Sequence, residues 1–75
     1  MDYGQRERLE REIAAHRGKI AEFAEELCLV EAIAARIARV PAQLVRHATL
    51  LRVALKGRRA AQEMVAERLA TNCAR

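Results

Sequence analysis

The chain has very few of the residues from which β-sheet domains are built. Aromatic residues make up 3% of its 75 residues, glycine and proline together number four, and tryptophan is absent. β-Sandwiches and barrels depend on aromatic-rich strands and on turns that contain glycine. The sequence therefore predicts an all-α fold, and its length leaves room for a single small domain over residues 1–75.

Groups for nucleophilic catalysis and metal binding are also scarce. The chain has no serine, and its soft metal ligands are limited to His16, Cys28, His47 and Cys73. In the helical arrangement predicted below, no two of these four side chains meet, so we expect neither a metal site nor a nucleophile beside a base. The sequence predicts a protein without enzymatic activity and without a cofactor.

Long apolar runs, targeting signals and a disulfide framework are missing as well. No uncharged apolar run approaches the roughly 18 residues of a membrane span, and no basic start followed by an apolar segment marks a secretory signal. Small secreted domains with a disulfide framework usually carry about four or more cysteines, and this chain has two. We therefore expect a cytoplasmic protein with reduced thiols and no membrane partner.

Charged residues are abundant, and their two signs are segregated along the chain. Residues 1–35 carry five basic and eight acidic side chains, a net charge of −3, whereas residues 36–75 carry nine basic and two acidic ones, a net charge of +7. The whole chain is basic, with a formal net charge of +4. Because unlike charges attract, the two parts of the chain are electrostatically complementary.

The only proline, Pro41, divides the chain into two helical segments. Proline removes a helical hydrogen-bond donor and disfavours the α conformation of the preceding residue, so one helix ends just before it and another begins with it or just after it. Asp2 and Gln5 resemble a capping box at the start of the first helix. Gly18 and Gly57 mark places where a bend or a close approach is expected. The predicted elements are a helix over about residues 3–39, a turn at about 40–42 and a helix over about 42–70.

Apolar residues recur in both segments at alternating intervals of four and three, as in heptad repeats. This spacing gathers them into one seam along each helix. The first seam consists of Leu9, Ile13, His16, Ile20, Phe23, Leu27, Val30, Ala34 and Ile37. The second seam consists of Leu44, Ala48, Leu51, Leu55, Arg58, Gln62, Val65 and Leu69.

A tight reversal at Pro41 lets the two seams face each other. Facing residues then have numbers that add to 81 or 82, so that Ile37 faces Leu44. We therefore predict an antiparallel two-helix hairpin, which is further favoured by ion pairs between its acidic and basic helices. The predicted ion pairs are Glu31 with Arg52, Glu25 and Glu26 with Arg58, and Glu22 with Arg59.

The part of the hairpin near the turn carries more apolar side chains than two helices bury against each other. Leaving each of them in water costs roughly 1.5–3 kcal/mol, which is large for a domain of marginal stability. We predict that they pack in a C2 homodimer that forms a four-helix bundle, and the alternative is a hetero-complex with a partner helix in this groove. The predicted interface residues are Leu29, Ile33, Val45, Leu50 and Val53.

A basic surface around the turn indicates nucleic-acid binding as the alternative function. Residues 36–59 contain seven arginines and lysines and no acid, a pattern typical of phosphate-binding surfaces. Residues 33–47 also resemble a helix-turn-helix, although they lack the usual turn glycine and the long helices favour a hairpin. The residues predicted to contact nucleic acid are Arg36, Arg39, Arg46 and His47.

These features together predict a small basic helical protein that acts by self-association and partner binding. Its function class is a regulator, an adaptor or a chaperone-like subunit, with nucleic-acid binding as the alternative.

Overall fold

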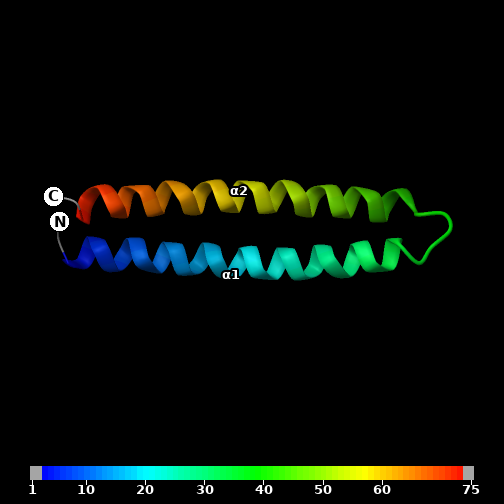
Figure 1. The fold of residues 1–75 in the computed structure, drawn as a ribbon, viewed down its shortest axis with the longest axis horizontal. Coiled ribbons are helices and arrows are strands. Elements are labelled where there is room, and N and C mark those ends of the chain that lie inside the picture. The colour runs from blue at the N-terminus through cyan, green and yellow to red at the C-terminus, as the bar shows by residue number, and fades with distance from the viewer. Residues whose placement is uncertain (1–2, 74–75) are drawn as a thin grey trace.

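The protein folds into two antiparallel helices joined by a seven-residue loop. A computed structural model describes residues 3–73, the side chain of Cys73 excepted; helix α1 spans Tyr3–Ala34 and helix α2 spans Ala42–Cys73, with 32 residues each. Figure 1 shows the helices side by side, with the termini at one end of the hairpin and the loop at the other. The predicted all-α hairpin is confirmed over the described residues, and the predicted cap at Asp2 lies outside them.

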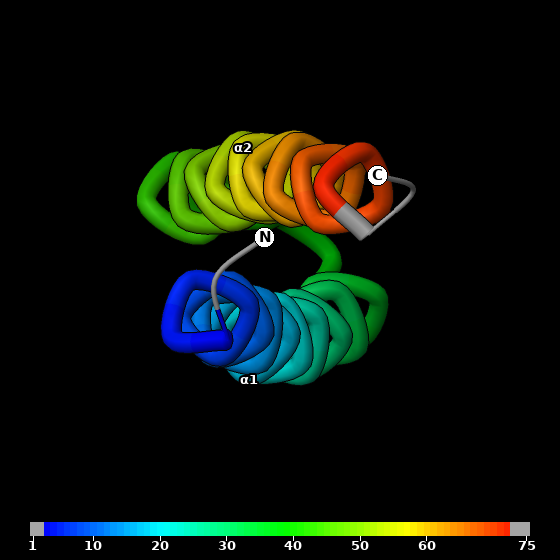
Figure 2. Tube along the Cα trace, turned by 90° about the vertical axis from the view of Figure 1, so that its left-hand side faces the viewer, coloured from blue at the N-terminus to red at the C-terminus, as the bar shows by residue number. Residues whose placement is uncertain are grey.

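The hairpin is a single layer of two helices and is strongly elongated. Its extents are 56 × 15 × 14 Å and its radius of gyration is 16.9 Å, whereas a compact domain of this length has a radius of gyration of about 11 Å. The view along the hairpin in Figure 2 shows the two helices as one pair, slightly inclined to each other. Within residues 3–73 there is therefore no third element to cover either broad side of the pair.

Helix α1 ends at Ala34, five residues before its predicted end. The backbone N–H groups of Arg36 and Ile37 donate to carbonyls three residues back, at 3.0 and 3.3 Å, which tightens the helix end into a 3₁₀ turn. Pro41 keeps the preceding residue out of the α region, and the chain needs the unwound residues to cross the 8–10 Å or so between helix axes. Ile37 consequently lies in the loop, 40% exposed, and its predicted place in the first seam is wrong.

Helix α2 begins where the sequence predicts and extends slightly further. The carbonyl of Pro41 accepts hydrogen bonds from the N–H groups of Leu44 and Val45, at 3.0 and 3.2 Å, so Pro41 is the N-cap residue and Ala42 the first helical one. The predicted end near residue 70 is three residues too early. The low helix propensity of residues 71 and 72 costs only about 0.5–0.7 kcal/mol each and does not stop the helix.

The predicted seams are the surfaces that the two helices turn towards each other. Every predicted seam residue between positions 9 and 34 of α1 and between positions 44 and 69 of α2 is buried or half-buried. Near the loop, Val30, Ala48 and Leu51 form the core cluster. The side chains that pack against the core cluster are Phe23, Leu27 and Leu44.

Two cross-helix contacts define the register of the seams. Glu26 Oε1 lies 3.1 Å from His47 Nε2, and Glu31 Oε1 lies 3.7 Å from Arg52 Nη2. Glu26 precedes a seam residue and Glu31 follows one, so the two pairs flank the seam on opposite sides. The residue numbers add to 73 in one pair and to 83 in the other, so facing residues within the seam add to about 78.

The predicted register, with sums of 81 or 82, is therefore wrong by about one helical turn. The physical reason is the early end of α1, because a loop over residues 35–41 reverses the chain about three residues before Pro41. The shift changes the contacts of the polar seam residues, which lie towards the termini. Phe23 packs against the core cluster instead of facing Arg58, and Arg58 Nη1 donates to His16 Nδ1 at 3.2 Å.

The shift also changes the cross-helix ion pairs. Among the described residues, the pair of Glu31 with Arg52 is confirmed, at 3.7 Å. Glu26 instead contacts His47, and Glu22 contacts Lys19 of its own helix at 3.3 Å. These side chains are about half exposed, so each pair contributes no more than about 1 kcal/mol.

Gly18 and Gly57 lie in the middle of the helices, but neither is a point of close approach. Apart from the helix's own backbone, no atom lies within 4 Å of where a Cβ would stand at either position, so the predicted close approach does not occur between α1 and α2. Both glycines instead leave helical backbone exposed to water, which lowers helix stability.

Replacing Gly18 with alanine is expected to raise the free energy of unfolding by about 1 kcal/mol, because alanine loses less conformational freedom in a helix. Chemical denaturation followed by circular dichroism measures the change as a higher midpoint with an unchanged slope. The control is Ala15→Gly, an exposed position on the same helix, which lowers the midpoint by a similar amount. An unchanged midpoint for both variants would contradict the continuous helix.

Candidate interaction surface

The five predicted interface residues are among the most exposed large apolar side chains of the hairpin. Their exposed fractions lie between 52% and 65%, although all five lie within five positions in the sequence of a residue of the core cluster. Burial within a single copy therefore does not explain them. Two of them belong to α1 and three to α2: Leu29, Ile33, Val45, Leu50 and Val53.

Three of the five share one side of the hairpin, the side of the Glu26–His47 pair. Leu29 and Ile33 follow Glu26 by three and seven positions, and Leu50 follows His47 by three. Residues at these spacings are neighbours on one side of a helix. Because Glu26 and His47 meet across the helices, the three apolar side chains form a common surface, here called the apolar face: Leu29, Ile33 and Leu50.

The remaining two predicted residues do not join the apolar face. Val45 precedes Arg52 by seven positions and lines a shallow hollow together with Glu31 and Arg52, on the opposite side of the hairpin. Val53 follows Leu50 by three positions, further round α2 and away from α1. The sequence alone identified five apolar residues that lie outside the seams. Which side of the hairpin each of them occupies follows from how the two helices face each other.

The register also sets the height of each residue along the hairpin. With facing numbers adding to about 78, Leu50 of α2 lies level with position 28 of α1. Leu29 and Leu50 therefore stand at nearly the same height on the two helices, with the Glu26–His47 pair between them. The sequence analysis did not predict this pair. It could have been found from the sequence, because Glu26 and His47 each directly precede a seam residue.

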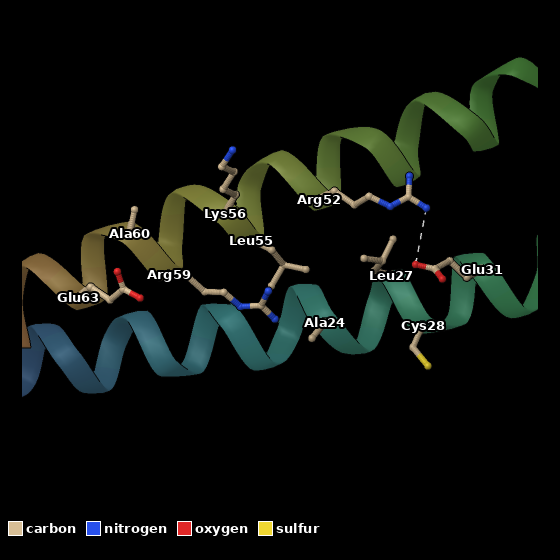
Figure 3. A pocket seen from close by; sticks show the side chains of 10 residues that line it. All are labelled: Ala24, Leu27, Cys28, Glu31, Arg52, Leu55, Lys56, Arg59, Ala60 and Glu63. Carbon is tan, nitrogen blue, oxygen red and sulfur yellow. Dashed lines mark ion pairs between the residues drawn. The ribbon is translucent and has the colours of Figure 1, made fainter.

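A shallow groove of about 780 Å³ runs along the opposite side of the hairpin. Leu27 and Leu55 contribute apolar surface to it, and a row of basic residues, Arg52, Lys56 and Arg59, borders it on α2. In Figure 3 Arg52 and Arg59 reach towards α1 and Lys56 points away from it. This side of the hairpin therefore carries a row of basic residues that the apolar face does not.

The four residues predicted to contact nucleic acid gather at the loop end of the hairpin. Arg36 and Arg39 lie in the loop, while Arg46 and His47 lie on α2, and all four are exposed. The ring of His47 contacts the carboxylate of Glu26 at 3.1 Å. An acidic group thus lies within this surface, which lowers its attraction for phosphates.

The described residues contain no group of three or more His, Cys, Asp or Glu side chains placed to hold a metal ion. His16 is in contact with Arg58, and His47 with Glu26. Cys28 has an exposed free thiol that points away from α2 in Figure 3. In the part of the chain that the structure describes, neither helix has a stretch long and apolar enough to cross a membrane.

No model of a protein family matches this chain, and neither a curated protein nor a solved structure matches it. The function is therefore inferred from the surface of the hairpin.

Proposed function

We propose that this protein is a non-enzymatic helical interaction module that acts by self-association and partner binding, in the role of a regulator, an adaptor or a chaperone-like subunit. The observation that carries the proposal is the group of half- to two-thirds-exposed apolar side chains near the loop. Isolated apolar side chains are normal on protein surfaces, whereas a group of them on a single-layer fold is typical of an interface.

The accessible surface of the chain supports self-association. The hairpin exposes 5901 Å², whereas a compact monomer of 8.4 kDa exposes about 4,600 Å². The excess of about 1,300 Å² is larger than the roughly 800 Å² that each partner buries in an interface of standard size. A dimer of two hairpins is a four-helix bundle, the simplest arrangement that gives each helix pair a second layer.

The thin core points in the same direction. Among the described residues, the buried apolar side chains are Leu9, Val30, Ala48, Leu51, Leu55 and Val65. A core of this size in 75 residues gives marginal stability, which small domains commonly supplement by oligomerisation. Self-association therefore serves the stability of the fold as well as its binding function.

The test is the mass of the protein in solution, measured by sedimentation equilibrium over a wide range of concentrations, with and without nucleic acid. The expected result is a mass of twice 8.4 kDa that does not change when nucleic acid is added. The mass of a single chain at every concentration would contradict self-association.

The same experiment distinguishes the alternative function. The arginines at the loop end would bind phosphates electrostatically, so nucleic-acid binding would fall steeply with salt and disappear in the Arg36→Ala, Arg39→Ala, Arg46→Ala triple variant. That outcome would favour a nucleic-acid-binding regulator. A dimer that is indifferent to nucleic acid favours the interaction module.

A further inference from the structure

We propose that a second copy of this chain docks on the apolar face, with the twofold axis parallel to the helices, so that Leu29 packs against the partner's Leu50. The inference rests on the proposed self-association and adds the face and the orientation. It selects three of the five predicted interface residues as the centre of the contact: Leu29, Ile33 and Leu50.

The distribution of charge selects this side of the hairpin. The opposite side carries Arg52, Lys56 and Arg59 along one edge of its groove. Arg52 is paired with Glu31 at 3.7 Å, but burying Lys56 and Arg59 against a second copy is unfavourable. Beside the apolar face, the polar groups of Glu26 and His47 contact each other at 3.1 Å. A carboxylate that already has a hydrogen-bond partner tolerates burial better than an unpaired charge.

The equal heights of Leu29 and Leu50 make the face self-complementary. Rotation about an axis parallel to the helices keeps the height of every residue and places α1 opposite the partner's α2. Leu29 then meets the partner's Leu50, and the symmetric contact forms at the same time. A twofold axis perpendicular to the helices would instead point the two hairpins in opposite directions. Because the apolar face lies near the loop of a hairpin 56 Å long, the two copies would then overlap over only part of their length.

The charges of the helices favour the same orientation. Residues 1–35, which include α1, carry −3, and residues 36–75, which include α2, carry +7. With the parallel axis, α1 lies against the partner's basic α2, so that helices of unlike charge face each other. With the perpendicular axis, α1 lies against another acidic α1.

The surface of α2 beyond Leu50 gives the partner's helix room to approach. Ala54, Gly57 and Ala61 follow Leu50 at alternating intervals of four and three, on the same side of the helix. A Cβ built at Gly57 meets nothing within 4 Å in the single hairpin. Small side chains at these positions allow two helices to pack closely along this line.

The test is site-specific crosslinking between copies. Both native cysteines are first replaced by alanine, and then the single variants Leu29→Cys and Leu50→Cys are prepared separately. Val45→Cys, on the opposite side of the hairpin, is prepared as the control. Each variant alone and an equal mixture of the two, allowed to exchange subunits, are treated with a short thiol-to-thiol crosslinker. Because the crosslink is irreversible, it accumulates even from a dimer that the change to cysteine weakens.

The expected result is covalent dimer in the mixture, in up to about half of the dimers by random exchange, and little in either variant alone. Efficient crosslinking of Leu29→Cys with itself would overturn the orientation. If sedimentation shows a dimer and only the control Val45→Cys crosslinks, the face is wrong while the proposed self-association stands. If sedimentation shows monomers throughout, the proposed self-association fails together with the face.

Discussion

The expected result of replacing Leu50 with aspartate is a monomer that keeps its helical hairpin. Leu50 is 61% exposed in the single chain, so a carboxylate there remains hydrated and the helices stay intact. In the proposed dimer two copies of Leu50 are buried, and the loss of roughly 1.5–3 kcal/mol for each weakens association by at least about 100-fold. Sedimentation equilibrium measures the mass, and far-ultraviolet circular dichroism measures the helix content.

The matched control is Val45→Asp on the same helix. Val45 is similarly exposed, at 53%, but lies beside Glu31 and Arg52 on the opposite side of the hairpin. An aspartate near the start of α2 also interacts favourably with the helix dipole. We expect this variant to remain a dimer. A dimeric Leu50→Asp variant would contradict the apolar face, and dissociation of both variants would contradict an interface confined to one side.

Replacing Leu51 with alanine acts on the fold itself. Leu51 is 6% exposed and forms the core cluster with Val30 and Ala48. Truncation of a buried leucine removes its packing and leaves a cavity, which lowers the free energy of unfolding by about 2–5 kcal/mol. A domain of this length has a total stability of only about 4–11 kcal/mol, so the variant is expected to be partly or largely unfolded.

Urea denaturation at a fixed protein concentration measures this loss, since the stability of a dimer depends on concentration. Val45→Ala is the control, because Val45 is exposed on the same helix, and its effect is expected to stay below about 1 kcal/mol. Equal effects of the two substitutions would contradict the core cluster. Together, the substitutions of Leu50 and Leu51 distinguish the side of α2 proposed to bind a second copy from the side that packs against α1.

The faces of the helices were predictable because they depend on local periodicity. Every predicted seam residue except Ile37 is buried or half-buried, including the polar ones His16, Arg58 and Gln62. Alternating steps of four and three put these positions on one stripe whatever their chemistry, so the pattern identifies even the polar members of the seam. The exposure of Leu29 and Leu50 was predictable for the same reason.

The pairing of the seams was not predictable from the same pattern. A repeat of seven residues remains consistent when one helix slides past the other, so the repeat does not determine where the chain reverses. Pro41 marks the start of α2 correctly, but α1 ends at Ala34 without a glycine, asparagine or proline next to it. An error of a few residues in the loop moved every predicted layer and most of the predicted ion pairs.

The sequence by itself determined two long helices, the residues that lie between them and the apolar residues left over. Each of these follows from the spacing of side chains along a single helix, a local property. Only the tertiary structure decided the register, the Glu26–His47 contact and the division of the exposed apolar residues between two sides. These depend on where the chain unwinds to cross between helix axes, because that crossing sets the height of every residue of one helix relative to the other.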